Sequence, residues 1–520
     1  MSAGIGVSPG VAVGIAARLG GDPSYTESDN KVPFHAALSA AAQELERLAA
    51  SVAAPAADVL GAQALMARDP VLADRIAGHQ RAGHPADRAV RAGFAEFREL
   101  LAAAGPYLAE RVADLDDVRD RVLAHLHGTT LPRIPRPGYP FVLVAEDLSP
   151  AQTATLRPGQ VLAIVTERGG PTSHTAILAK ALGIPAVVAC PAAATIGDGQ
   201  SVLVDGLAGT VDVEPPAGTI AAALEREDRR RAAATAVTGP GRTADGHPVK
   251  LLVNVGGDRD LDTTAEGVGL FRTEFLFLDR DEAPTVDEQR AAYGRVFAAF
   301  AGRTVVVRTL DAGADKPLRF ATAPREPNPA LGVRGLRAAR RAPELLDGQL
   351  RAIAAAAADH DAQVWVMAPM VSTAAEAADF AARAHAHGLP TAGVMVEVPA
   401  AALRAEQVAA ACDFLSVGTN DLAQYTMAAD RQHADLAALL DPWQPAVLEL
   451  VRRTAEAGAR LGKPVGVCGE AASDPRLAVV LVGLGVTSLS MAPVALPAVR
   501  AALAAHTLAD CRRLAAEALS

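Results

Sequence analysis

The stretch TVVVRTLD, residues 304–311, shows the pattern that decides the fold of the larger half of this chain. Its run of β-branched residues favours a buried strand, and the polar Arg308 and Asp311 follow near its end. Strand-like runs of this kind occur eight times between residues 250 and 493, and helical stretches separate them. Because strands and helices that alternate in this way close into a barrel, we expect a C-terminal (β/α)8 TIM-like barrel over residues 244–520.

Polar and reactive side chains gather at the carboxyl ends of these runs. Together with one arginine in a following loop, they are Arg272, Arg308, Asp311, Glu397, Asn420, Asp421, Arg431, Cys468 and Glu470. The active site of a barrel lies at this end of its strands. A single residue of this kind is more simply explained as part of a structural salt bridge, but packing does not explain so many strands that end in the same way. We therefore expect a binding site in the mouth of the barrel.

Three arginines of this set, Arg272, Arg308 and Arg431, occur in a chain whose formal net charge is −10. The planar guanidinium group binds phosphate or carboxylate through paired hydrogen bonds and stays charged when it is desolvated. Glu397 and Asp421 end neighbouring runs, and such hard oxygen ligands suit Mg²⁺. The alternative is that these two carboxylates pair with the same arginines. The residue types therefore indicate a site for a small phosphorylated carboxylate, with Mg²⁺ as the cofactor.

Cys468 ends one of the runs and is bracketed by Gly466 and Gly469. Most buried cysteines are inert, but a thiol that faces an anionic pocket stays protonated because the nearby negative charge raises its pKa. We therefore interpret Cys468 as a proton donor. The four cysteines of the chain lie far apart and form no CxxC pair, which argues against a disulfide framework or a zinc site and favours a cytoplasmic setting.

Charge and hydropathy argue against two further classes of protein. The net charge of −10 argues against a nucleic-acid-binding surface. Residues 477–499 carry no charge over a length that could span a bilayer, but two glycines and two prolines interrupt them. We expect this segment to form packed core, without stable membrane insertion. The first ten residues lack the basic start and apolar centre of a signal peptide.

The other half of the chain predicts an α/β domain that a helical segment interrupts. Strand-like runs occur in residues 1–20 and again in 130–215, and we expect these two parts to form the domain. Residues 21–129 contain four runs of helical periodicity, one of them over 59–75, and predict a helical-bundle insert. Residues 216–243 are charged, are bracketed by proline and glycine, and predict a linker helix.

The stretch GGPTSHTAILAKALG, residues 169–183, places His174 at the start of a helix. Taken alone, it favours a histidine that caps the helix. The barrel site, however, has no obvious phosphoryl acceptor of its own, and the N–H groups and dipole at a helix start would stabilise a phosphoryl group on His174. Thr166 precedes this stretch, and we expect its hydroxyl to fix the tautomer of the imidazole ring.

Six stretches of the chain, taken in order, resemble the phosphoenolpyruvate–protein phosphotransferase family, which is enzyme I of the bacterial sugar phosphotransferase system. They are GGPTSHTAILAKALGIPAVV, GVGLFRTEFLFLDRD, VVVRTLDAGADKP, VMVEVPAA, LSVGTNDLAQYTMAADR and VGVCGEAASDP. The resemblance covers essentially the whole chain and is weakest in the helical insert. The ordered combination is specific, whereas pyruvate,phosphate dikinase and phosphoenolpyruvate synthase share several of the single motifs.

The resemblance implies a role for each matching residue. It implies that His174 is the phosphorylated histidine, that Cys468 protonates the enolate of pyruvate, and that Glu397 and Asp421 hold Mg²⁺. The residues implied to bind phosphoenolpyruvate are Arg272, Arg308, Asn420, Asp421 and Arg431. The resemblance also implies that the helical insert docks the phosphocarrier protein HPr, that the barrel forms a homodimer, and that the α/β domain swivels between substrate and carrier.

Two other functions stand as alternatives at this point. A phosphoenolpyruvate synthase or dikinase would need a large ATP-binding domain, and only about 130 residues precede the point where the α/β domain resumes; they contain no glycine-rich nucleotide loop. A non-catalytic phosphoenolpyruvate sensor would have lost key residues, and none is lost. Pro171 and Lys180 stand where arginine is usual in the family, and Gln444 stands where histidine is common; these departures leave every catalytic group in place.

Overall fold

The chain divides into two compact units, Met1–Asp228 and Arg229–Ser520. The first unit contains a mixed sheet and a group of helices, and the second contains a closed barrel. The computed structural model describes all residues except 1, 21–31, 51–55, 104–111, 133, 158, 171–172, 259–260, 278–279, 281, 314–317, 319, 321–325, 327 and 431–433.

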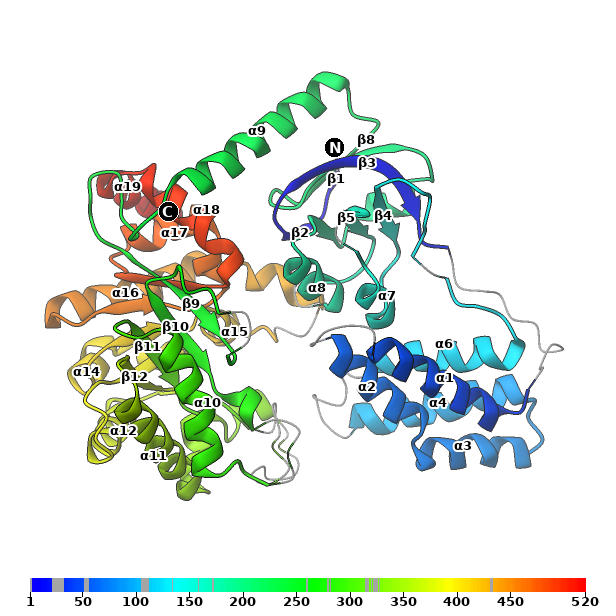
Figure 1. Ribbon diagram of the computed structural model, residues 1–520, viewed down its shortest axis with the longest axis horizontal. Helices are drawn as coiled ribbons and strands as arrows, with labels where there is room; N and C mark the ends of the chain where they lie inside the picture. Colours follow the sequence, from blue (N-terminus) through cyan, green and yellow to red (C-terminus); the bar gives the residue numbers. More distant parts are fainter. Residues whose placement is uncertain are drawn as a thin grey trace. The chain divides into compact units, whose positions relative to one another are not determined.

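The second unit is a closed barrel of eight strands, drawn in green to red in Figure 1. Each strand pairs in parallel with the next, and the last pairs with the first, so the barrel has no open edge. The strands are β9 (Lys250–Val255), β10 (Gly267–Arg272), β11 (Thr304–Arg308), β12 (Gln363–Ala368), β13 (Ala392–Val396), β14 (Leu415–Val417), β15 (Val465–Val467) and β16 (Ser488–Met491). They coincide with the eight runs of the sequence, which confirms the predicted (β/α)8 barrel.

Helices cover the outside of this barrel (Figure 1). They are α10 (Val286–Ala299), α11 (Pro343–Asp359), α12 (Ala374–Ala386), α13 (Pro399–Leu403), α14 (Ala405–Ala410), α15 (Thr419–Met427), α16 (Pro445–Leu461), α17 (Pro475–Gly483), α18 (Leu496–Ala504) and α19 (Leu508–Leu519). The uncharged segment 477–499 forms most of α17, strand β16 and the start of α18, which confirms that it belongs to a packed core. Among the described helices, none is both long enough and apolar enough to cross a membrane.

Apolar side chains fill both faces of the barrel strands. On β11, Val305 and Val307 are fully buried against the outer helices, while Val306 belongs to an inner cluster with residues such as Met367 and Phe414. Successive residues of a strand point to opposite sides, and here both sides are covered. Burying one valine or leucine side chain stabilises the fold by roughly 1.5–3 kcal/mol. This double burial explains why the strands appear in the sequence as continuous apolar runs.

The sheet of the first unit has eight strands in the order β1-β8-β7-β3-β4-β5-β6-β2. They are β1 (Ser2–Ala3), β2 (Ile5–Ser8), β3 (Val11–Arg18), β4 (Phe141–Ala145), β5 (Val161–Thr166), β6 (Ala186–Val188), β7 (Ser201–Asp205) and β8 (Thr210–Val213). Strand β3 pairs in parallel with β4 and antiparallel with β7, so segments on both sides of the helical region share one sheet. Two helices, α7 (Pro150–Ala154) and α8 (His174–Leu182), belong to this part of the chain.

Five described helices lie between β3 and β4, one more than the sequence predicts. They are α1 (Phe34–Ala49), α2 (Ala56–Ala67), α3 (Pro70–Arg81), α4 (Ala86–Ala103) and α6 (Val112–His127). The prediction of one helix over 59–75 is wrong, because that segment divides into α2 and α3. Asp69 caps α3 by accepting a hydrogen bond of 2.8 Å from the Val71 N–H, and Pro70 occupies the first helical position.

A single long helix, α9 (Ala217–Ala236), occupies most of the segment 216–243. The boundary between the two compact units falls within this helix, between Asp228 and Arg229. After it, the segment around the bridge between Arg242 and Pro248 is bound to the barrel, where the Glu266 carboxylate accepts from the N–H groups of Gly241 and Leu251 over 2.8 and 2.9 Å.

Candidate active site

The end of β11 carries a buried arginine that carboxylates surround. Nη2 of Arg308 donates to Oε1 of Glu274 over 3.0 Å, and its Nη1 lies 3.4 Å from Oδ2 of Asp311. All three side chains are buried. Burial alone would lower the pKa of Arg308, but the negative charges of Glu274 and Asp311 outweigh burial and raise the pKa. The guanidinium group therefore stays charged inside the barrel mouth.

A second buried arginine, Arg334, joins two aspartates across the mouth. Its Nε and Nη2 donate to the carboxylate of Asp311 over 3.1 and 3.0 Å, and its Nη1 and Nη2 donate to that of Asp421 over 3.2 and 3.1 Å. Nη1 also donates to the hydroxyl of Tyr425 over 3.3 Å. Asp311 follows β11 and Asp421 lies in α15 after β14, so this arginine ties together the ends of two non-adjacent strands.

Glu397 follows β13 and belongs to the same buried cluster. Its Oε1 accepts a hydrogen bond of 2.7 Å from the Met370 N–H, and a Cβ atom on Gly418 would lie 3.0 Å from its Oε2. Burial, followed by the negative charges of Asp421 and Asp311, raises the pKa of Glu397 to about 8. The two predicted metal ligands, Glu397 and Asp421, therefore interact with each other in the folded barrel.

This donor set fits Mg²⁺. Glu397 and Asp421 supply the hard carboxylate oxygens that this ion prefers, and a divalent cation would relieve the repulsion that raises the pKa of Glu397. In the part of the chain that the structure describes, no group of three or more His, Cys, Asp or Glu side chains could hold a metal ion. Oxygen atoms of water and substrate would therefore have to complete the coordination, as is usual for Mg²⁺.

Cys468 lies directly after β15, buried between charged groups of the mouth. Burial is the largest influence on its thiol and raises the pKa, so the thiol is protonated at neutral pH. Its Sγ lies 3.5 Å from the carbonyl oxygen of Val417. The next residue has to be glycine, because a Cβ atom on Gly469 would lie 1.8 Å from Oγ1 of Thr419 and 2.8 Å from its backbone nitrogen. The strand end that carries Cys468 thus packs directly against the start of α15.

Asn420 lies beside Asp421 in the first turn of α15. Its Oδ1 accepts a hydrogen bond of 3.1 Å from the Glu470 N–H, which connects the end of β14 with the end of β15. The same two strand ends pack together at Gly469, so the position of Asn420 is determined by its own hydrogen bond and by this close packing.

Arg272 ends β10 and its side chain is exposed to solvent. Many protein atoms nevertheless surround the guanidinium group of Arg272. The resulting loss of solvent lowers its pKa most, and the positive charge of Arg308 lowers the pKa further. Both observations fit a guanidinium group in a concave mouth, where a bound anion could reach it. Arg431, the third predicted arginine, lies outside the described residues.

His174 is the first residue of α8. Ser173 caps this helix by accepting a hydrogen bond of 3.3 Å from the Ala176 N–H, which confirms the predicted helix start. The structure describes the backbone of His174 and not its side chain, and Pro171 lies outside the described residues. The hydroxyl of Thr166 donates to the Arg168 carbonyl over 2.7 Å, so its oxygen atom retains lone pairs with which to accept a hydrogen bond.

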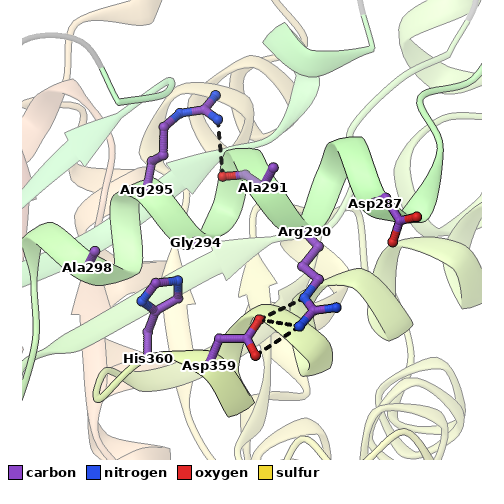
Figure 2. A pocket seen from close by; sticks show the side chains of 8 residues that line it. All are labelled: Asp287, Arg290, Ala291, Gly294, Arg295, Ala298, Asp359 and His360. Carbon is purple, nitrogen blue, oxygen red and sulfur yellow. Dashed lines mark hydrogen bonds and ion pairs between the residues drawn. The ribbon is translucent and has the colours of Figure 1, made fainter.

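A separate hollow of about 450 Å³ lies on the outside of the barrel, between α10 and α11 (Figure 2). In it, Arg290 donates to the carboxylate of Asp359 through Nε over 2.7 Å and Nη2 over 2.9 Å. Figure 2 shows Arg295 directed away from this pair, toward the Ala291 carbonyl. None of the predicted site residues lines this hollow, so the candidate site remains the cluster at the strand ends.

The sequence pattern does not predict two members of that cluster. Glu274 stands within GVGLFRTE, two residues after Arg272, and no local signal distinguishes it there from an ordinary surface glutamate. Arg334 lies in GVRGLR, outside every strand-like run. No local signal separates Arg334 from its neighbours Arg337 and Arg340, and only the fold shows that it is buried at 1% exposure.

Three family models match successive parts of the chain. They describe the N-terminal domain of PEP-utilising enzymes over residues 3–111, their mobile domain over 139–209 and their PEP-binding domain over 230–508. The last model alone covers more than half of the chain, and it contains the whole cluster of buried arginines and carboxylates.

Curated relatives match over nearly the full length. A protein of Streptomyces coelicolor named phosphoenolpyruvate-protein phosphotransferase is 51% identical over 99% of this chain and 95% of its own length. Proteins with the same name from Haloferax volcanii and Bacillus subtilis are 41% and 37% identical, over 99% and 94% of this chain and 96% and 91% of their own lengths.

Proposed function

Since the chain belongs to the phosphoenolpyruvate–protein phosphotransferase family, we propose that it transfers the phosphoryl group of phosphoenolpyruvate to its own His174 and then to a histidine of the carrier protein HPr. The observation that carries this proposal is the cluster at the strand ends, in which buried Arg308 and Arg334 alternate with Glu274, Asp311 and Asp421. Such a constellation suits a small substrate with both phosphate and carboxylate groups.

The substrate would bind between the arginines and the start of α15. Arg308 stays charged when buried and Arg272 is accessible from the mouth, so both guanidinium groups would bind phosphate oxygens, with Arg431 as a third. The amide oxygen of Asn420 accepts a hydrogen bond from the Glu470 N–H, so the NH₂ group of Asn420 can donate to the substrate. Asp421 belongs to the same turn of α15.

Glu397 and Asp421 would hold Mg²⁺, which when bound supplies positive charge against the phosphate and enolate oxygens. Asp421 has both oxygens hydrogen-bonded to Arg334 in this structure, so its role as a ligand requires that it share or exchange this partner. Glu397 keeps Oε1 on the Met370 N–H, and that bond fixes the direction of its other oxygen.

His174 would act as the nucleophile. A neutral ring nitrogen attacks phosphorus, the bond between phosphorus and the enolate oxygen breaks, and the electron pair stays on that oxygen. We expect the oxygen of Thr166, which donates its own proton to the Arg168 carbonyl, to accept from the opposite N–H of the ring and so hold the reactive tautomer. The N–H groups at the start of α8 then stabilise the phosphoryl group on His174.

Cys468 would protonate the enolate that phosphoryl transfer leaves behind. Its protonated thiol gives a proton to the methylene carbon of the enolate, which yields pyruvate, and the thiolate recovers a proton from solvent. Burial keeps the thiol neutral until the enolate forms, so the proton is available when it is needed.

The helical region would dock HPr, and α9 would act as the hinge that lets the swivelling phosphohistidine α/β domain reach both partners. The apolar side chains of Leu65 in α2 and Val71 in α3 are 72% and 48% exposed and would be available to such a surface. We propose that the α/β domain comprises residues 1–20 and 130–215, and that the helical insert comprises 21–129. The linker helix would span 216–243 and the barrel domain 244–520. We further propose a cytoplasmic homodimer, assembled through the barrel, that serves sugar uptake.

The test is phosphorylation of the purified full-length chain with phosphoenolpyruvate and Mg²⁺. The wild-type protein should acquire an acid-labile, base-stable phosphate and pass it to HPr, while His174→Ala should acquire none because the nucleophile is absent. His35→Ala is the matched control, since His35 also lies in the first turn of a helix, α1, and it should behave as wild type. Full labelling of His174→Ala, or no labelling of the wild-type protein, would reject the proposed function.

A further inference from the structure

A buried glutamine lies beneath the mouth of the barrel, outside the residues that the proposed reaction uses. Gln349 belongs to α11 and is 1% exposed. Its Oε1 accepts from the Leu310 N–H over 2.9 Å, and its Nε2 donates to the hydroxyl of Thr273 over 3.0 Å. Thr273 follows β10 and Leu310 follows β11, so one side chain binds the segments after two neighbouring strands.

The hydroxyl of Thr273 closes this arrangement. It donates to the carbonyl oxygen of Arg308 over 2.9 Å, and it is itself the acceptor for Gln349. Thr273 is the residue after Arg272, and Leu310 is two residues after Arg308. Gln349 and Thr273 therefore connect the residue after Arg272 with the backbone at and after Arg308, which are two of the three arginines of the predicted phosphate site.

The donors determine the orientation of the amide. The Leu310 N–H can only donate, so the amide oxygen of Gln349 faces it and the NH₂ group faces two hydroxyls. The second of these belongs to Tyr293, 3.1 Å away, whose own hydroxyl donates to Oε1 of Gln289 over 3.0 Å. Nε2 of Gln289 in turn donates to the Pro284 carbonyl over 2.9 Å. The hydrogen bonds thus run from outer helix α10 to the strand ends.

We propose that Gln349 is a positioning residue that sets the separation of Arg272 and Arg308 and so the fit of the substrate's phosphate group. This inference rests on the proposed function. The guanidinium group of Arg308 is also held by Glu274, whereas Arg272 has an exposed side chain and depends more on where its backbone lies. Since a guanidinium group binds phosphate through paired hydrogen bonds of fixed geometry, loss of this connection should weaken substrate binding measurably.

The deciding variant is Gln349→Met, which keeps the length of the side chain and removes all three hydrogen bonds. In the full-length protein with Mg²⁺ and a His174→Ala background, which prevents phosphoryl transfer during the titration, we expect the Kd for phosphoenolpyruvate, measured by calorimetry, to rise about tenfold. With His174 in place, KM should rise with it, while kcat at saturating phosphoenolpyruvate should change less, because no group that touches the reacting atoms is removed.

Gln289→Met is the matched control, because it removes two hydrogen bonds from the same chain without touching either strand end. It should lower the melting temperature as Gln349→Met does, and it should leave the Kd within twofold of wild type. Equal weakening of binding by both variants, or unchanged binding in Gln349→Met, would overturn the positioning role.

A second variant, Thr273→Val, removes the shared hydroxyl with little change in volume and should also weaken binding about tenfold. If Gln349→Met does not fold, Thr273→Val becomes the deciding variant. A Kd of Thr273→Val within twofold of wild type would then reject the positioning role. A wild-type protein that binds no phosphoenolpyruvate would reject the proposed function and this inference together, whereas wild-type binding with unaltered variants would reject only the inference.

Discussion

The barrel mouth and the start of α8 hold their functional groups in different ways. In the mouth, Arg334 alone makes four hydrogen bonds to Asp311 and Asp421, and these side chains are almost fully buried. At α8, the structure describes a local contact beside the backbone of His174: the hydroxyl of Ser173 caps the helix. A small charged substrate needs rigid, converging groups such as those of the mouth, whereas we propose that His174 has to meet two partners.

The largest effect should come from breaking the buried charge cluster. Arg334→Met removes the cation that Asp311 and Asp421 share, and an uncompensated buried charge costs about 3–5 kcal/mol. We expect the free energy of unfolding of the barrel to fall by that amount. Urea denaturation followed by tryptophan fluorescence measures this directly, because both tryptophans of the chain, Trp365 and Trp443, lie in the barrel unit.

The control for this prediction is an exposed ion pair in the same unit. Arg513 pairs with Glu517 on the surface of α19, with side chains 59% and 60% exposed. Exposed pairs contribute roughly 0–1 kcal/mol, so Arg513→Met should leave the urea midpoint nearly unchanged. If Arg334→Met and Arg513→Met shift the midpoint equally, the mouth is no more rigidly held than the surface.

A smaller effect should separate two glycines, Gly469 beside Cys468 and Gly170 four residues before His174. Gly469→Ala would place Cβ 1.8 Å from Oγ1 of Thr419, and such overpacking costs roughly 1–3 kcal/mol. Gly170→Ala, four residues before His174, meets no atom of the described residues within 4 Å and should change stability by less than about 0.5 kcal/mol. Thermal melting of the two variants tests this contrast, and comparable losses would show that the two sites are packed alike.

The last prediction concerns the pH dependence of stability that Glu397 causes. Its pKa is near 4.5 as a free side chain and about 8 in the folded barrel, so between these values the folded chain keeps a proton that the unfolded chain releases. The stability of the metal-free protein should therefore decrease as pH rises through this window, by up to about 1.4 kcal/mol per pH unit. Urea midpoints of wild type and Glu397→Gln between pH 5 and 8 measure the slope.

In this comparison Glu397→Gln, which cannot ionise, should lack that part of the slope. Parallel curves for the two proteins would contradict the burial and charge repulsion that raise the pKa of Glu397. Mg²⁺ should raise the stability of the wild-type protein at pH 8 and leave the stability of Glu397→Gln unchanged. This result would support Glu397 as a metal ligand.

Sequence patterns succeeded where burial affects every residue of an element. All eight barrel strands were predicted because both faces of each are covered, so apolar residues are continuous. The helix over 59–75 was predicted wrongly because the apolar spacing persists while the chain ends α2 and begins α3 at Asp69 and Pro70. Periodicity reports which face is buried, whereas the cap and the proline decide where a helix starts.

The sequence by itself determined the barrel, the strand-end position of Arg308, Glu397, Asp421 and Cys468, and the helix that begins at His174. Only the tertiary structure decided that Arg334 is buried between two aspartates and that Gln349 binds the segments after β10 and β11. The physical reason is how far apart in the sequence the interacting residues lie. A strand end is marked by its own neighbours, but the partner of a buried arginine or amide lies tens of residues away and is selected only when the barrel closes.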